Sequence, residues 1–204
     1  MTLLNQKGTP HVERTFIILK SDAVQRGLIG EIVARFEKAG LKVVGMKMLV
    51  ADKALGDQHY PLSRTEFVEG LGKRTLESYA EQGIDAEKEF GHTDPHKIGE
   101  QVRKWLVDYL TSGPVVAVVL EGPHAIEMVR KFIGNTMPVK AMPGTIRGDY
   151  SFDSSAYANQ NRRPIRNLIH ASGNKEEAEF EISLWFKPEE MFDYDSVHQR
   201  HMTA

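Results

Sequence analysis

Val115-Val116-Ala117-Val118-Val119-Leu120 is the stretch that decides the fold. An unbroken apolar run this short, rich in β-branched residues, predicts a strand that is buried on both faces. Thr15-Phe16-Ile17-Ile18-Leu19 predicts a second buried strand, which ends at Lys20-Ser21-Asp22. Leu41 to Val50 is also typical of a strand, and the apolar run from Ile182 to Phe186 predicts a last strand that closes the sheet.

Two segments between these strands carry apolar residues at helical spacing. A glycine that suits a helix C-terminus, Gly40 or Gly134, follows each of them. The repeats are Leu28, Ile29, Ile32, Val33 and Phe36 in the first segment, and Ala125, Ile126, Val129 and Phe132 in the second. The order of elements predicts an α/β (α+β) sandwich of the ferredoxin-like βαββαβ type, with an antiparallel sheet.

Composition limits the class of protein. The 204 residues, 41% hydrophobic and 26% charged, predict a single folded domain over residues 1–204 and argue against disorder. A net charge of -2 gives no general attraction to nucleic acid or to an anionic membrane. The chain has no cysteine, its first residues from Met1 to Val12 are polar, and no apolar run is long enough to span a bilayer. We therefore expect a cytoplasmic protein.

Two segments are expected to be additions to the sandwich. Residues 72–108 are polar and helix-prone, with turn signals at Gly91 and Thr93-Asp94-Pro95. Residues 151–166 are rich in Ser, Asn, Gln and Arg, which predicts a surface loop. The alternating His92, Asp94 and His96 in the first segment leave a metal site open as an alternative, although a solvated loop explains them more simply.

Phosphate-binding signals are present only as separate cations. The sequence has neither a Gly-x-x-x-x-Gly-Lys-Ser/Thr loop nor a Gly-x-Gly-x-x-Gly turn. Lys20 follows the first strand, and Arg130 lies on the second helix, six residues before Thr136. Arg147 lies in Pro143-Gly144-Thr145-Ile146-Arg147-Gly148-Asp149, where the glycines allow a ligand to approach the backbone.

Asn167-Leu168-Ile169-His170-Ala171-Ser172-Gly173-Asn174 contains the strongest candidate for chemistry. Taken alone, this segment favours a histidine that is simply packed in the core. The acidic residues that follow on a predicted helix favour a second interpretation, because one of them could hold the ring and leave its other nitrogen free to attack. These acids are Glu176, Glu177, Glu179 and Glu181.

Five blocks in order resemble the nucleoside diphosphate kinase family. The blocks are Glu13-Arg14-Thr15-Phe16 with Lys20-Ser21-Asp22 and Val24-Gln25-Arg26-Gly27-Leu28; His59-Tyr60; Ser112-Gly113-Pro114-Val115-Val116; Pro143 to Asp149; and Asn167 to Ser172, leading into Leu184-Trp185-Phe186. The resemblance implies a ferredoxin-like fold and a ping-pong transfer of the γ-phosphate from a nucleoside triphosphate to a nucleoside diphosphate.

The resemblance also implies roles for individual residues. His170 would carry the phosphate, Glu181 would orient it, and Ser172 would adjoin it. Phe67 and Leu71, four residues apart on a predicted helix, would clamp the base, and the loop from Gly134 to Pro143 would cover the nucleotide. The residues around the phosphates and ribose would be Lys20, Tyr60, Arg130, Thr136, Arg147 and Asn167.

The resemblance extends to partners and leaves alternatives open. Mg²⁺ would bridge the phosphates of the nucleotide without dedicated protein ligands, the nucleotides would include ATP and GTP, and the chain would form a homo-oligomer. Nucleic acid and membrane would not be primary partners. A nucleotide-binding regulatory protein with poor catalysis and a phosphohistidine relay to proteins remain alternatives.

One departure lies beside the histidine. The family usually has Gly-Ser-Asp after it, whereas this chain has Ala171-Ser172-Gly173. Glycine in place of aspartate removes a carboxylate and a potential helix cap, and Asn174 is expected to replace the cap. Because the histidine, the lysine and both arginines are present, we interpret the change as tuning of the site.

Overall fold

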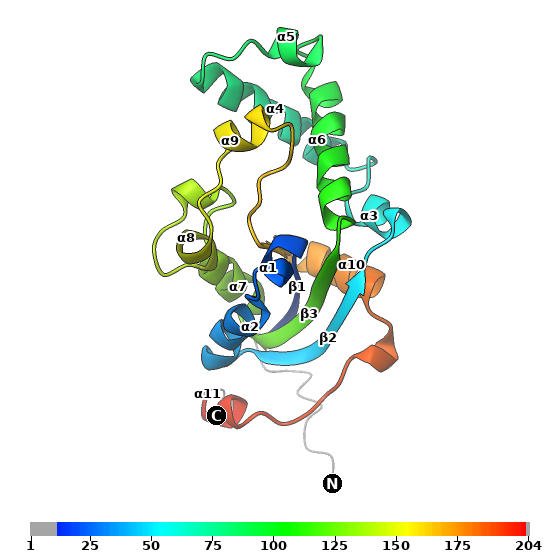
Figure 1. The fold of residues 1–204 in the computed structure, drawn as a ribbon. Coiled ribbons are helices and arrows are strands. Elements are labelled where there is room, and N and C mark those ends of the chain that lie inside the picture. Colours follow the sequence, from blue (N-terminus) through cyan, green and yellow to red (C-terminus); the bar gives the residue numbers. More distant parts are fainter. Residues whose placement is uncertain (1–11, 203–204) are drawn as a thin grey trace.

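A four-stranded antiparallel sheet in the order β2-β3-β1-β4 forms the centre of the fold (Figure 1). The computed structural model describes residues 12–202, so the polar start of the chain up to residue 11 lies outside the described residues. The strands are β1 (Val12–Leu19), β2 (Lys42–Val50), β3 (Pro114–Pro123) and β4 (Ile169–Ala171). This order and the antiparallel pairing confirm the predicted ferredoxin-like sandwich.

The remaining elements are helices that connect and cover the strands. None of the helices within residues 12–202 is both long and apolar enough to cross a membrane. The α-helices are α1 (Ser21–Gln25), α2 (Ile29–Lys38), α3 (Lys53–His59), α4 (Thr65–Glu81), α5 (Ala86–Phe90), α6 (Pro95–Leu110), α7 (Ala125–Ile133), α8 (Ile146–Tyr150), α9 (Ser155–Gln160), α10 (Lys175–Trp185) and α11 (Val197–Met202), and the 3-10 turns are η1 (Pro138–Lys140) and η2 (Pro188–Glu190).

Both faces of the central strands β1 and β3 are buried, which explains why these strands are continuously apolar. Successive side chains of a strand point to opposite faces. In β1, Ile17 and Leu19 pack in one core cluster with Ile32 and Phe36 of α2. Phe16 and Ile18 pack in a second cluster on the other face, where Trp185 at the end of α10 belongs. The residues of β3 divide between the two clusters in the same way.

The prediction of a strand over 182–186 was wrong. These residues form the end of α10 and the position after it, and the fourth strand is the short β4 around His170. Ile182, Trp185 and Phe186 are spaced i, i+3 and i+4, so they share one face of a helix, whereas a strand would place Ile182 and Trp185 on opposite faces. Trp185 and Phe186 are buried beneath the sheet by this arrangement.

The segment 151–166 contains a short helix, so its prediction as a plain surface loop was wrong in part. The Oγ atom of Ser154 accepts a hydrogen bond from the Tyr157 amide (3.2 Å) and caps α9. Asp153 is buried and accepts hydrogen bonds from Arg163 (2.6 Å) and from the Arg166 amide (2.6 Å). These polar contacts order the segment although it lacks apolar periodicity.

Helices α4, α5 and α6 project away from the sheet, and α9 lies beside α4 (Figure 1). Two glycines allow the backbones of α4 and α6 to cross closely. A Cβ atom on Gly72 would lie 1.7 Å from the Pro95 carbonyl oxygen, and one on Gly99 would lie 1.9 Å from the Val68 carbonyl oxygen. Neither position can accept a side chain unless the helices move apart.

We expect Gly72→Ala and Gly99→Ala each to lower the free energy of unfolding by about 1–3 kcal/mol, because each forces the helix pair apart. Thermal unfolding monitored by circular dichroism measures the loss. Gly30→Ala is the matched control, since a Cβ atom there has nothing within 4 Å, and helix propensity predicts a gain of up to about 1 kcal/mol. Equal melting temperatures for all three variants would contradict the close crossing.

Candidate active site

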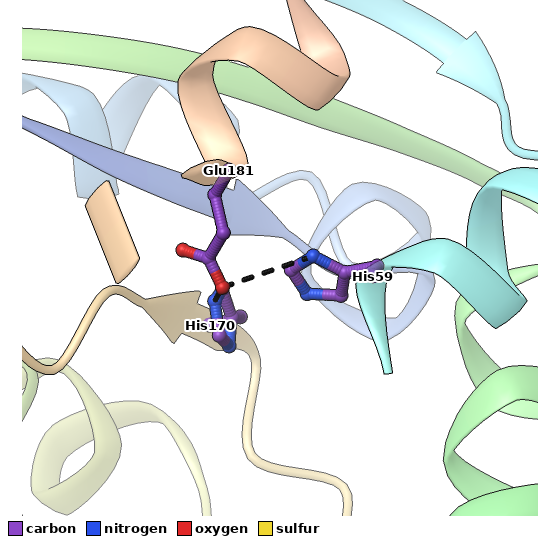
Figure 2. A group of neighbouring side chains, drawn as sticks. All are labelled: His59, His170 and Glu181. Atoms are coloured by element: carbon purple, nitrogen blue, oxygen red, sulfur yellow. Dashed lines mark hydrogen bonds and ion pairs between the residues drawn. The ribbon is translucent and has the colours of Figure 1, made fainter. Parts of the chain in front are cut away.

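His170 and Glu181 lie at the centre of the candidate site (Figure 2). His170, on β4, has its Nε2 atom 2.7 Å from Oε1 of Glu181, on α10. The Ser172 hydroxyl donates to the other carboxylate oxygen of Glu181 at 2.5 Å. A carboxylate accepts hydrogen bonds, so Nε2 of His170 carries the proton and Nδ1 holds the free lone pair. The structure brings Glu181 and His170 together.

A second histidine packs against the first. His59, the last residue of α3, lies edge-on to His170 with the ring centroids 4.6 Å apart. The indole Nε1 of Trp185 donates to His59 Nδ1 at 3.3 Å. Burial, followed by repulsion between a protonated His59 and its neighbours His170, Lys20 and Arg64, holds the pKa of His59 well below its usual value. His59 is therefore neutral and buried, and its ring packs against one side of the His170 ring.

Only one group of side chains in residues 12–202 has the spacing of a metal site. The ligand atoms of His59, His170 and Glu181 all lie within 4.8 Å of one another. Mg²⁺ prefers oxygen ligands, so two imidazoles do not suit it. His59 Nδ1 and His170 Nε2 are also already used by Trp185 and Glu181. We therefore attribute the group to hydrogen bonding.

Lys20 lies at the start of α1 and is buried. Its Nζ atom donates to Oδ1 of Asn167 at 2.7 Å, and the Asn167 amide nitrogen donates to the Thr136 carbonyl oxygen at 2.9 Å. Burial, followed by repulsion from Arg147, lowers the pKa of Lys20 to about 8. Lys20, Thr136 and Asn167 thus lie together, as predicted. The side-chain hydrogen bond of Lys20 is made to a neutral amide oxygen and not to a carboxylate.

Arg147 is also buried, and backbone carbonyl groups hold its guanidinium. It donates to the carbonyl oxygens of Gly134 (3.0 Å), Asn167 (3.2 Å) and Ile169 (2.6 Å). Burial, followed by repulsion from Arg130, lowers the pKa of Arg147 to about 10. Arg147 thereby fixes the backbone just before His170 and at Gly134. Arg130, in contrast, lies exposed on α7.

Aromatic rings lie on another side of His170. Tyr60 is buried, with its ring 6.3 Å from that of His170, and it stacks on Phe67 at 6.1 Å. Burial and the charge of Glu181 raise the pKa of Tyr60, so its hydroxyl keeps its proton. Phe67 and Leu71 lie one helical turn apart on α4, as predicted. The Phe67 ring stacks on Tyr60, and Tyr60 in turn contacts the His170 ring.

Comparison of this chain with known proteins identifies its family. The family model described as nucleoside diphosphate kinase matches residues 13–77 and 86–191. A nucleoside diphosphate kinase from Pyrobaculum aerophilum is 49% identical over 182 residues, which cover 89% of this chain and 99% of that protein. The chain belongs to the nucleoside diphosphate kinase family. It is a phosphotransferase that moves the terminal phosphate of a nucleoside triphosphate to a nucleoside diphosphate.

Solved structures agree with this assignment. The crystal structure of an NDP kinase from Pyrobaculum aerophilum is similar with a TM-score of 0.87 and 48% identity, covering 89% of this chain and 100% of that one. A nucleoside-diphosphate kinase from Borrelia burgdorferi, described as a transition-state mimic with bound vanadate and ADP, has a TM-score of 0.74 and 37% identity. That similarity covers 94% of this chain and 96% of the other.

Some residues of this nucleoside diphosphate kinase site were not predicted. His59 stands in a block that carried the resemblance, but nothing in the sequence placed it against His170. Arg103, from the predicted addition, donates to the Tyr60 carbonyl oxygen at 2.6 Å.

His92, Asp94 and His96 do not form a metal group; Asp94 instead caps α6 by accepting from the His96 amide (2.8 Å). Asn174 caps α10 as predicted, accepting from the Glu177 amide at 2.8 Å.

We expect kcat/KM for a nucleoside triphosphate to fall as pH rises through about 8, because Lys20 then loses its proton and its attraction for phosphate. A steady-state pH profile measures this. Lys20→Arg keeps a charge at every pH tested, so its profile should stay flat near pH 8, even if its activity is lower. An equally steep fall in Lys20→Arg would show that another group titrates.

The same pKa shift predicts the stability of the nucleotide-free kinase. In the unfolded chain Lys20 keeps its proton up to about its ordinary pKa of 10.5, so between about pH 8 and 10.5 the unfolded state binds more protons. The contribution of Lys20 to the free energy of unfolding is therefore most unfavourable below pH 8 and rises across that window. Denaturant unfolding of the parent and of Lys20→Met should show a difference that changes over this range.

Proposed function

We propose that His170 is the residue that carries the phosphate in this kinase, through its Nδ1 atom. The observation that supports this assignment is the bond from Nε2 of His170 to Glu181, which leaves Nδ1 as the nucleophilic nitrogen. The second hydrogen bond, from Ser172 to Glu181, holds the carboxylate in place. A histidine fixed by an orienting carboxylate is a suitable nucleophile for phosphoryl transfer.

In the first step, the Nδ1 lone pair attacks the γ-phosphorus, a P–N bond forms, and the bond from phosphorus to the bridging oxygen breaks. The nucleoside diphosphate leaves with the electron pair. In the second step, a terminal oxygen of another nucleoside diphosphate attacks the phosphorus, and the P–N bond breaks. The proton on Nε2 stays in its hydrogen bond with Glu181 throughout, so His170 returns to its starting form.

Positive charge around the transferred group lowers the barrier in this scheme. The equatorial oxygens of the phosphoryl group need stabilisation in the transition state. Lys20 supplies it from a buried position, and Arg130 lies exposed where it can meet the nucleotide. The further nucleotide-binding residues that we propose are Tyr60, Phe67, Leu71, Thr136, Arg147, Asn167 and Ser172.

The nucleotide brings its own cation in this scheme. Mg²⁺ would enter as part of the substrate, together with ATP, GTP or another nucleotide, and would supply positive charge at its phosphates. Phe67 and Leu71 hold the base, because an aromatic face stacks on any base and so accepts many nucleosides. The loop from Gly134 to Pro143 covers the bound nucleotide. The similarity to the Borrelia burgdorferi kinase, whose structure holds ADP and vanadate, supports this choice of ligand class.

Labelling tests the role of His170. With γ-labelled ATP and no acceptor, we expect an acid-labile, base-stable label on the protein, which leaves when a nucleoside diphosphate is added. His170→Ala should take up no label, and its circular dichroism spectrum should match that of the parent. Intact, folded parent protein without label would refute the assignment.

The same experiment separates the two alternatives. A regulatory protein that only binds nucleotide would retain ATP without forming the covalent label. A phosphohistidine relay to proteins would form the label but would not release it to a nucleoside diphosphate. The high similarity to nucleoside diphosphate kinases favours rapid release to the diphosphate.

We further propose that the chain works as a single cytoplasmic kinase domain over residues 1–204, with additions at about 72–108 and 151–166. Neither nucleic acid nor a membrane is proposed as a partner, because the net charge is -2 and basic residues are not interleaved with aromatic ones.

We also propose that the kinase is a homo-oligomer assembled through β2. This strand is at the edge of the sheet, and Met46, Met48 and Val50 alternate along it with 55%, 57% and 64% of their surface exposed. The C-terminal segment pairs with only part of the strand, where the Phe192 amide donates to the Val44 carbonyl oxygen. A second copy would cover both the free edge and the apolar row.

We expect Met46→Glu combined with Met48→Glu to reduce the molar mass toward that of a monomer, because two carboxylates would be buried in the interface. Size-exclusion chromatography with light scattering measures the mass. Val139→Glu is the control, since Val139 is similarly exposed (61%) but lies in η1, away from the strand. An unchanged mass for the Met46/Met48 variant would place the interface elsewhere.

A further inference from the structure

Position 173 lacks a side chain, but a carboxylate fills the space beside it. Oε2 of Glu177 accepts a hydrogen bond from the Gly173 amide at 2.7 Å. A Cβ atom built on Gly173 would lie only 2.9 Å from that same oxygen and 3.9 Å from Nη1 of Arg130. The Glu177 carboxylate therefore occupies the volume into which a side chain at position 173 would extend.

The geometry of α10 brings Glu177 to this place. Asn174 is the N-cap, so Glu177 is the third residue of the helix, and its side chain can reach back to the amides that precede the first turn. A negative charge at this end of a helix is favourable. Partial burial tends to raise the pKa of Glu177, but the hydrogen bonds from Arg64 and the Gly173 amide outweigh it, so the pKa is lowered and the group is charged at neutral pH.

The second oxygen of Glu177 connects the turn after His170 to Phe67, the ring that we propose stacks on the base; we call Phe67 the base platform. Nη2 of Arg64 lies 2.5 Å from Oε1 of Glu177. The same guanidinium lies over the ring of Phe67, with its central carbon 5.5 Å from the centroid. Arg64 is the N-cap position of α4, the helix that carries Phe67. One carboxylate thus joins the turn after His170 to the start of α4.

We infer that Glu177 places a carboxylate, from one helical turn away, in the space that a side chain at position 173 would fill, and that it acts as a positioning residue for nucleotide binding. It holds Arg64 in place and, through Arg64, fixes the position of the base platform, Phe67, relative to His170. This inference rests on the proposed function for the identity of the ligand. Gly173 and Glu177 therefore form a matched pair: a side chain at 173 and a glutamate at 177 compete for the same space.

Moving the carboxylate from position 177 to position 173 tests the inference. Glu177→Ser removes the link to Arg64, and Gly173→Asp forces a second carboxylate against Glu177. We expect each single variant to raise KM and the Kd for ADP by about fivefold, the upper range for a partly exposed ion pair. The double variant Gly173→Asp/Glu177→Ser restores one carboxylate in the available space, so both constants should return to within about twofold of the parent values.

The readout distinguishes positioning from general damage. Because the bond between His170 and Glu181 is untouched, kcat at saturating nucleotide should change less than KM in every variant. Glu179→Ser is the matched control on the same helix. Glu179 is exposed and pairs with the exposed Lys175 at 3.9 Å, so no constant should change. Melting temperatures identify any variant that fails to fold. If Glu177→Ser is such a variant, Glu177→Gln, which keeps the shape of the side chain, tests the loss of its charge.

Two results would overturn the inference. One is a double variant whose losses equal or exceed the product of the losses in the single variants, since that would show independent sites. The other is a pair of single variants that bind ADP as the parent does. Isothermal titration calorimetry with ADP does not depend on turnover, so a parent that binds ADP without becoming phosphorylated would refute the role of His170 and still give the coupling between positions 173 and 177.

Discussion

The buried carboxylate of Glu181 is the constraint on which the site depends. Its side chain is almost completely buried, and an ionised carboxylate in the protein interior is costly unless hydrogen bonds satisfy it. Each oxygen receives one hydrogen bond, from His170 and from Ser172. Both donors come from the end of β4 and the turn after it, so satisfying Glu181 fixes where α10 packs beneath the sheet. The same requirement that stabilises the fold therefore aims the histidine.

Two cations of the site, Lys20 and Arg147, are in the opposite situation, since they are buried without a carboxylate hydrogen bond. Lys20 donates to an amide oxygen and Arg147 to three carbonyl oxygens, and burial lowers the pKa of both. Neutral partners fix the direction of a cation but do not cancel its charge. An anion with several oxygens would do both, which suits a polyphosphate. The site thus sacrifices stability in the empty protein for a preorganised charge that favours phosphoryl transfer.

The sequence predicts those parts of the molecule whose signals are local or come from family resemblance. Strands β1 and β3 were predictable because burial on both faces makes them continuously apolar, and the pair of His170 and Glu181 followed from the resemblance. Strand β4 was not, because three residues with a histidine in the centre show no period. The partners of Arg147 could not be predicted either: they are backbone carbonyl groups, which any residue supplies, and only tertiary structure decides which ones are near.

The segment predicted as an addition contributes to the site, and the nature of its contacts explains how. Arg103 of α6 donates to the carbonyl oxygens of Tyr60 (2.6 Å) and Asp57 (3.1 Å) and pairs with the Asp57 carboxylate at 2.7 Å. Tyr109, on the same helix but just beyond that segment, places its ring 5.3 Å from Lys20 Nζ. Two of the three bonds from Arg103 reach backbone atoms, which persist whatever side chains stand at those positions. An added helix pair can therefore brace the loop that carries His59 and Tyr60 without any change in the residues that face the nucleotide.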